Sequence, residues 1–359
     1  MTTTSELKQQ TGKVLTHVAG YVSMRTIEIG LSSGLIGELA SHANGLTVPG
    51  LAERCELDPF YVRVWCRSAY AAEVLELHEA TSTEGYDPQS RAFTAPAEQR
   101  YTLAAHMAAV LLDETHPDYI GGIPTVMVQR EIFDAFAERL TSGERSWWDK
   151  CSPEFIDGVS GAGLPYYTRM IPGGLSRIPG LEQRLRSGAA VTELSSAAGR
   201  GLAMLAKHFP KCQLTGVHGD AYSLELASKR IADAGLGDRT TLVQSTLEDF
   251  DVIDQDVVFI NISMHECRDI DKVTANVSRA LRPGGVFVIS DFPFPESTTD
   301  CRTVPARIMS GIQFFEALMD DQLMATSAFV NQLARHGFDD VASFDITSTH
   351  VVIHGTKRA

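Results

Sequence analysis

The sequence predicts a two-domain α/β protein, in which a mainly helical N-terminal domain precedes a doubly wound, mostly parallel β-sheet. Two patterns predict this fold class. Over the first 110 residues, apolar side chains recur at helical spacing in several segments. From residue 188 to the end, short β-branched apolar runs alternate with helical patterns, which is typical of a Rossmann-like sheet. The 359 residues are enough for both domains.

The N-terminal domain, expected over residues 1–110, has the element order of a winged helix. Helices are predicted at 12–29, 31–40, 47–55 and 58–72, and two strands at 74–78 and 100–103 would form the wing. Thr47 and Asp58 are residue types that cap helices, and each precedes a proline near the first turn. We expect this domain to serve dimerisation or to close the pocket.

Charge argues against nucleic acid as a partner of this domain. Residues 1–100 contain eight Lys and Arg against twelve Asp and Glu, and the predicted recognition helix offers only Arg63 and Arg67. A DNA reader needs a basic face. The formal net charge of −14 equally disfavours an anionic membrane.

Residues 111–187 are expected to form a helical linker that acts as a pocket lid. Helical patterns run over 106–114, 119–141 and 153–178. Trp148 and Tyr167 each belong to an adjacent aromatic pair whose two members point to different sides of a helix. They are candidates for lining a substrate pocket, and core packing is the alternative for at least one member of each pair.

The C-terminal domain, expected over 188–359, alternates strands and helices. Strands are predicted at 189–194, 213–217, 241–244, 256–262 and 286–291, helices at 200–208, 223–234, 270–281 and 322–336, and an antiparallel hairpin at 340–345 and 350–354. In such sheets, ligands bind at the carboxyl ends of the parallel strands.

Cysteine spacing and hydropathy suggest a reduced compartment and no metal site. The six cysteines include no CxxC pair, so neither a zinc site nor a disulfide framework is expected. No apolar run is long enough to span a membrane, and the polar N-terminus lacks the pattern of a signal peptide. We therefore expect a cytoplasmic protein.

Several phrases resemble bacterial winged-helix methyltransferases of class I, which use S-adenosylmethionine (SAM) and act on small molecules. They are Leu281-Arg-Pro-Gly-Gly-Val-Phe-Val-Ile, Asp238-Arg-Thr-Thr-Leu-Val-Gln, Met107 to Glu114 and Tyr166 to Gly180. The resemblance covers nearly the whole chain. It implies the family's fold, a small-molecule substrate and a homodimer, while a hetero-complex with a pathway protein stays open.

The chain differs from this family at the residues that bind SAM in the family. The family loop reads acid-x-Gly-x-Gly-x-Gly, and alignment on Glu193 places Ser195, Ala197 and Gly199 at its glycine positions. His218 replaces the acid that accepts both ribose hydroxyls. Thr246 replaces the Asp that meets the adenine.

Two such losses predict weak binding of SAM. A lost charged hydrogen bond costs about 1.5–3 kcal/mol, so two would remove several decades of affinity. Compensation by Asp220 or Asp249 would still allow SAM to bind. We therefore expect no cofactor, with SAM as the alternative, held by Glu193, Ser195, Ala197, Gly199, His218, Thr246 and Asp249.

The candidate catalytic residues are His265 and Glu266, which follow the fourth predicted strand. The family has a His-Asp pair at this place, and the resemblance implies that His265 is a general base. A purely structural histidine is the alternative. Asp269 and Asp271 either orient His265 or cap the next helix. The further substrate-pocket candidates are His218, Asp291 and Arg307.

These observations favour an enzyme of bacterial natural-product biosynthesis that has lost its dependence on SAM. It would catalyse a cofactor-free cyclisation, elimination, rearrangement or intramolecular displacement such as aziridine closure, with His265 as base. A SAM-dependent O- or N-methyltransferase is the alternative. A non-catalytic partner subunit is the second alternative.

Overall fold

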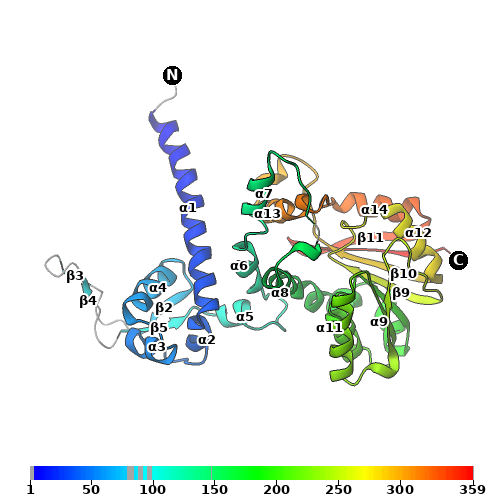
Figure 1. Cartoon of the computed structure of the whole chain (residues 1–359), viewed down its shortest axis with the longest axis horizontal. Helices are drawn as coiled ribbons and strands as arrows, with labels where there is room; N and C mark the ends of the chain where they lie inside the picture. The colour runs from blue at the N-terminus through cyan, green and yellow to red at the C-terminus, as the bar shows by residue number, and fades with distance from the viewer. Residues whose placement is uncertain (1–3, 79–84, 88–91, 95–98, 147, 359) are drawn as a thin grey trace. The chain divides into compact units, whose positions relative to one another are not determined.

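The computed structural model describes residues 4–78, 85–87, 92–94, 99–146 and 148–358. The chain divides into two compact units, Met1–Val128 and Gln129–Ala359. Figure 1 shows the elements of each unit. The predicted three-part division at residues 110 and 187 stays a prediction.

The N-terminal unit contains helices around a small antiparallel sheet, as the sequence predicts. Strand β5 (Arg100–Leu103) lies between β1 (Leu46–Thr47) and β2 (Leu75–His78). The helices are α1 (Thr4–Ser32), α2 (Leu35–Ala40), α3 (Val48–Arg54), α4 (Pro59–Ala71), α5 (Met107–Leu111) and α6 (Gly122–Met127), and β3 (Gly85–Asp87) pairs with β4 (Ala92–Thr94). Both predicted caps are confirmed: Thr47 accepts a hydrogen bond from the Gly50 amide, and Asp58 accepts from Phe60 and Tyr61.

The C-terminal unit is built on a seven-stranded sheet in the order β11-β12-β10-β9-β6-β7-β8. Its strands are β6 (Ala190–Leu194), β7 (Gln213–His218), β8 (Thr240–Gln244), β9 (Gln255–Asn261), β10 (Leu281–Asp291), β11 (Phe338–Thr347) and β12 (His350–Lys357). The five predicted parallel strands and the terminal antiparallel hairpin are all present.

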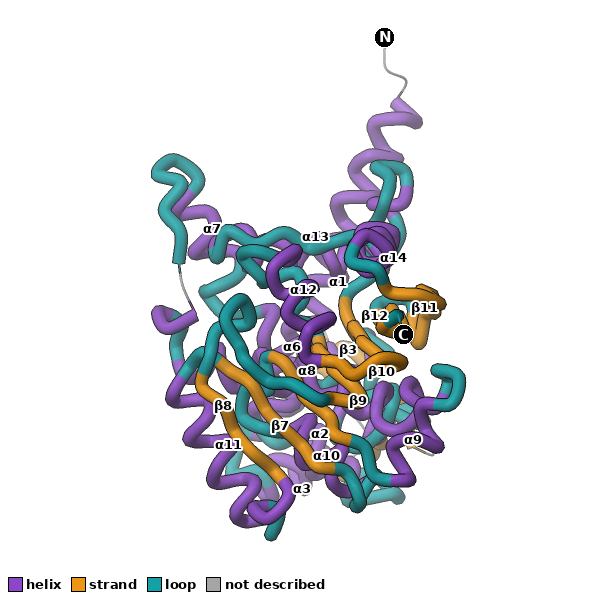
Figure 2. Tube along the Cα trace, turned by 90° about the vertical axis from the view of Figure 1, so that its right-hand side faces the viewer, coloured by secondary structure: helices purple, strands orange, loops and turns teal. Residues whose placement is uncertain are grey.

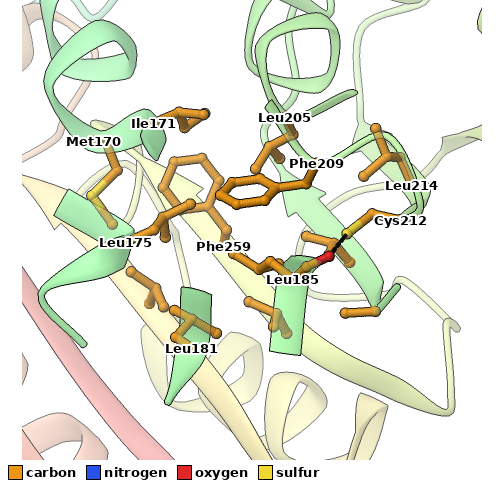
Figure 3. Packing of buried hydrophobic residues seen from close by; sticks show 14 of the residues in the cluster. Met170, Ile171, Leu175, Leu181, Leu185, Leu205, Phe209, Cys212, Leu214 and Phe259 are labelled. Atoms are coloured by element: carbon orange, nitrogen blue, oxygen red, sulfur yellow. Dashed lines mark hydrogen bonds between the residues drawn. The ribbon is translucent and has the colours of Figure 1, made fainter. Parts of the chain in front are cut away.

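Helices cover both faces of this sheet (Figure 2). The helices of this unit are α7 (Phe133–Arg139), α8 (Pro153–Arg169), α9 (Leu181–Ser187), α10 (Arg200–His208), α11 (Ala221–Asp233), α12 (Ile270–Ala280), α13 (Val304–Leu318) and α14 (Thr326–Arg335). One buried cluster joins α9 and α10 to the sheet through Leu185, Leu205 and Phe259 (Figure 3). A second joins α12 and α14 to it through Val277 and Phe329. This packing of helices against the sheet holds in place the strand ends that carry the site.

Some predicted helices are shorter or divided in the structure. The pattern at 119–141 forms α6 and α7 with a break between them, and the pattern at 153–178 stays α-helical only to Arg169. Ile171 has an extended conformation because it precedes Pro172, and that conformation interrupts the helix. The helix predicted from residue 322 begins at Thr326, and that predicted at 106–114 covers only Met107–Leu111. No helix in the described part of the chain is long and apolar enough to cross a membrane.

One face of α1 presents large apolar side chains to solvent. Those exposed are Leu7, Val14, Leu15, Val18, Tyr21, Val22 and Ile29. A contiguous apolar face of this kind marks an interaction surface more often than a solvated one. It agrees with the dimerisation role predicted for this domain.

We expect a double substitution, Val18→Glu with Val22→Glu, to shift the chain from dimer to monomer, because two charges would have to be buried in the interface. Size-exclusion chromatography with light scattering measures the molar mass. Gln10→Glu adds charge to an already polar position of α1 and should leave the mass unchanged. A wild-type monomer would contradict the prediction.

Candidate active site

His265 and Asp291 form a buried hydrogen-bonded pair at the carboxyl ends of two adjacent strands. His265 follows β9, and Asp291 is the last residue of β10, which runs parallel to β9. The His265 Nδ1 atom lies 2.8 Å from Asp291 Oδ1, and both side chains are 1% exposed. The Phe292 amide also donates to Asp291 Oδ1. The carboxylate therefore holds the proton on Nδ1 and leaves Nε2 to face the opposite side.

Glu316 of α13 lies on that opposite side. Its Oε1 atom is 3.7 Å from His265 Nε2, and its side chain is 6% exposed. Burial alone would lower the pKa of His265, but the Asp291 and Glu316 carboxylates raise it well above its usual value. The imidazole thus carries a proton in the resting protein at neutral pH. Sequence reasoning missed Glu316; the available signal was a lone acid in the apolar stretch of α13.

Glu266 lies beside this pair without being the hydrogen-bonded partner of His265. Burial raises the pKa of Glu266 to about 8, the charge on His265 opposes that shift, and the charge on Glu316 adds to it. The Glu266 carboxyl is therefore largely protonated at neutral pH. The acid that orients His265 is Asp291, which the sequence suggested only for the substrate pocket.

The two other acids considered as partners of His265 have structural roles. Asp269 caps α12, where its Oδ1 accepts a hydrogen bond from the Lys272 amide at 2.9 Å. Asp271 accepts from Arg335 and lies 2.8 Å from His336 Nε2. The capping interpretation of Asp269 is the one that the structure shows.

The loop after β6 keeps the backbone of a glycine loop although two of its glycine positions carry side chains. Ser195 has φ 55°, Ala197 has φ 42° and Gly199 has φ 73°. For residues other than glycine, this left-handed conformation costs roughly 1–2 kcal/mol each. Such strain persists only where the surrounding structure imposes it, and it is concentrated at functional sites.

Glu193 lies beneath this loop and does not reach solvent. Its side chain is fully buried, and burial raises its pKa to about 8, while the Tyr167 hydroxyl and the Leu202 amide oppose the shift. A Cβ atom at Gly201 would come within 2.2 Å of Glu193 Oε1 and 2.4 Å of Tyr167 Cε1. Packing of Glu193 and Tyr167 thus explains why residue 201 is glycine.

We expect Gly201→Ala to destabilise the fold by about 1–3 kcal/mol, because the added methyl overpacks a closed region. Urea denaturation measures the change. Gly161→Ala is the control, since a Cβ there meets nothing within 4 Å and alanine favours a helix. Equal stability of the two variants would contradict this account of Gly201.

The remaining predicted cofactor residues offer no free carboxylate. His218 ends β7, and burial lowers its pKa, which the charge of Asp220 opposes. Asp220 caps α11 by accepting from the Ser223 amide. The Thr246 hydroxyl donates to Asp249 at 2.9 Å, and Asp249 also pairs with Lys272 at 2.8 Å.

The substrate-pocket candidates divide between the core and the surface. The Trp148 ring lies 6.3 Å from that of Phe315, the residue before Glu316. Tyr167 packs beside Glu193, as described above. The Arg307 side chain is exposed on α13, and His218 is partly buried. The Phe292 ring, whose centroid lies 5.6 Å from that of His265, forms an apolar wall beside the histidine.

A second buried polar group adjoins the site and was not predicted from sequence. The Ser290 hydroxyl donates to Asn261 Oδ1 at 2.6 Å and lies 2.8 Å from His350 Nε2. Burial, with a contribution from the charge of Arg169, lowers the pKa of His350 to about 3. His350 is therefore neutral and structural, unlike His265.

Comparison with known proteins agrees with this architecture. Residues 192–287 match a family model described as a methyltransferase domain. No curated protein matches the sequence. The solved structures of similar fold include the SAM-dependent methyltransferase SibL in its apo form (15% identity, 97% of this chain and 99% of that chain, TM-score 0.68). The chain has the methyltransferase fold.

Two further solved structures share this fold over nearly their whole length. The mitomycin 7-O-methyltransferase MmcR is 15% identical over 99% of this chain and 100% of its own, with a TM-score of 0.67. The human N-acetylserotonin methyltransferase, in complex with SAM, is 12% identical over 98% of each chain, with a TM-score of 0.67. The predicted fold class, including the N-terminal helical domain, is confirmed.

Proposed function

We propose that this chain is a small-molecule methyltransferase that transfers a methyl group from SAM to a hydroxyl or amine in natural-product biosynthesis. The observation that carries the proposal is the buried His265 imidazole between the Asp291 and Glu316 carboxylates, at the carboxyl ends of central strands. The fold supports it, because the similar solved structures include a mitomycin O-methyltransferase.

In this mechanism His265 takes the proton of the methyl acceptor. Asp291 holds Nδ1–H, so the lone pair available to a substrate is that of Nε2. When Nε2 takes the proton, the two carboxylates stabilise the imidazolium. Because they also raise the pKa of His265, the base form is scarce at neutral pH, and the rate should rise as pH increases above neutrality.

The loop that would hold SAM has left-handed residues at its expected glycine positions, while the chain departs from the family at the residues that would anchor the cofactor. SAM would supply the electrophilic methyl group. Residues 195–199 would hold it, since the strained left-handed conformations at Ser195 and Ala197 preserve the loop path. His218 cannot accept hydrogen bonds from both ribose hydroxyls, as a carboxylate can. The Asp249 carboxylate already forms an ion pair with Lys272. We therefore infer weaker binding of SAM than a complete anchor set would give.

A second candidate is a SAM-independent reaction in the same fold, the interpretation that the sequence favoured. Two observations support it: His218 and Thr246 have no carboxylate, and the Asp249 carboxylate pairs with Lys272. His265 would then deprotonate the substrate for an intramolecular displacement, such as aziridine closure, or another cofactor-free step. A non-catalytic subunit, the third candidate, predicts that His265→Ala leaves the activity of its complex unchanged.

Titration calorimetry with SAM and S-adenosylhomocysteine tests the proposal. We expect detectable binding by the wild type and binding about tenfold or more tighter by His218→Asp, since a restored charged hydrogen bond contributes about 1.5–3 kcal/mol. His208→Asp, on the surface end of α10, is the matched control. No binding by the wild type up to millimolar concentration, with none gained in His218→Asp, would overturn it in favour of the cofactor-free reaction.

A further inference from the structure

Three side chains around His265 bring potential metal ligands together. They are His265, Glu266 and Glu316, and one ligand atom from each lies within 4.8 Å of the others. The first two belong to the loop after β9 and the third to α13. Cysteine spacing in the sequence gave no sign of such a site, because its ligands are an imidazole and two carboxylates separated by about fifty residues.

The cluster contains buried polar atoms for which the described residues provide no hydrogen-bond partner. These atoms are His265 Nε2 and Glu316 Oε2, on side chains that are 1% and 6% exposed. A buried polar atom without a hydrogen-bond partner is unfavourable, and more so when the group is charged. Both atoms belong to the groups that converge, so a bound cation would satisfy them at once.

The surroundings of the histidine match those of a metal ligand. Asp291 accepts a hydrogen bond from Nδ1–H at 2.8 Å, which directs Nε2, the nitrogen available to a metal once it has lost its proton, toward Glu316. Histidines that bind metals commonly donate their other ring nitrogen to a carboxylate in this way. A further acid, Asp321, adds negative charge nearby, although its pairing with Arg268 at 2.9 Å leaves it outside the ligand set.

We propose that His265 Nε2, Glu266 and Glu316 bind a divalent first-row transition-metal cation. One imidazole nitrogen and two carboxylates suit Mn²⁺, Fe²⁺ or Zn²⁺, whereas Mg²⁺ and Ca²⁺ prefer oxygen ligands alone. The cation would displace the protons otherwise held by His265 Nε2 and Glu266, and would occupy the lone pair with which His265 accepts a proton. It would therefore inhibit base catalysis and compete with protons for the site.

This proposal does not depend on the identity of the reaction. If SAM fails to bind and no methyl acceptor is found, the cation site remains to be tested by itself. If methyl transfer is established, the cation becomes an inhibitor of that reaction, because it occupies the nitrogen that would accept the proton.

Mn²⁺ binding to the full chain, followed by electron paramagnetic resonance of free Mn²⁺, tests the site. We expect one equivalent to bind to the wild type, and at least tenfold weaker binding by Glu316→Gln and by His265→Ala. Asp291→Asn should weaken binding about 10–100-fold, because it removes the carboxylate that orients the ligand. Asp271→Asn is the matched control, since it removes an exposed carboxylate beside His336 and should not alter the affinity.

Absence of binding to the wild type at 1 mM Mn²⁺, or affinity unchanged in Glu316→Gln, would overturn the proposal. A second measurement, made on the wild type alone, tests the site even if the variants fail to fold. Bound Mn²⁺ should broaden the imidazole proton resonances of His265 before those of His336, and broadening of His336 alone would count against the site.

Discussion

The site depends on one arrangement of charges: a buried imidazole with a carboxylate on either side. Burying a charge is costly unless it is paired and hydrogen-bonded. Asp291 supplies the hydrogen bond, and Glu316 supplies a second negative charge at 3.7 Å. The parallel register of β9 and β10, which pairs Asn261 with Ser290, brings the His265 loop to the end of the strand that carries Asp291. Helix α13 then closes the other side.

The loop after β6 and the histidine site give different signals about function. At the loop after β6, the chain holds Ser195 and Ala197 in conformations that glycine would adopt without strain. The resemblance to SAM methyltransferases leads us to expect acids at positions 218 and 246, where the chain has His218 and Thr246. We infer that SAM binds weakly or that another molecule takes its place, while His265 keeps Asp291 as its hydrogen-bonded partner.

Much of the fold was predictable from sequence because it rests on local signals. β-branched runs gave the central strands, and Thr47 and Asp58 gave the helix starts. The break within 119–141 and the short helix α9 were missed, since periodicity alone does not mark such boundaries. His265 was predicted from its place after β9. Glu316 was not, because its relation to His265 is created by tertiary packing across about fifty residues.

The most direct test of this account is the titration of the His265 imidazole by nuclear magnetic resonance in chelator-treated protein. We expect a pKa well above the usual value in the wild type and a clearly lower pKa in Glu316→Gln, which lacks one of the two carboxylates that raise it. Asp271→Asn, which removes a carboxylate that does not contribute to the His265 shift, should leave the pKa of His265 unchanged. A His265 pKa that is ordinary in the wild type, or unmoved in Glu316→Gln, would contradict the central claim that two carboxylates hold a proton on this histidine.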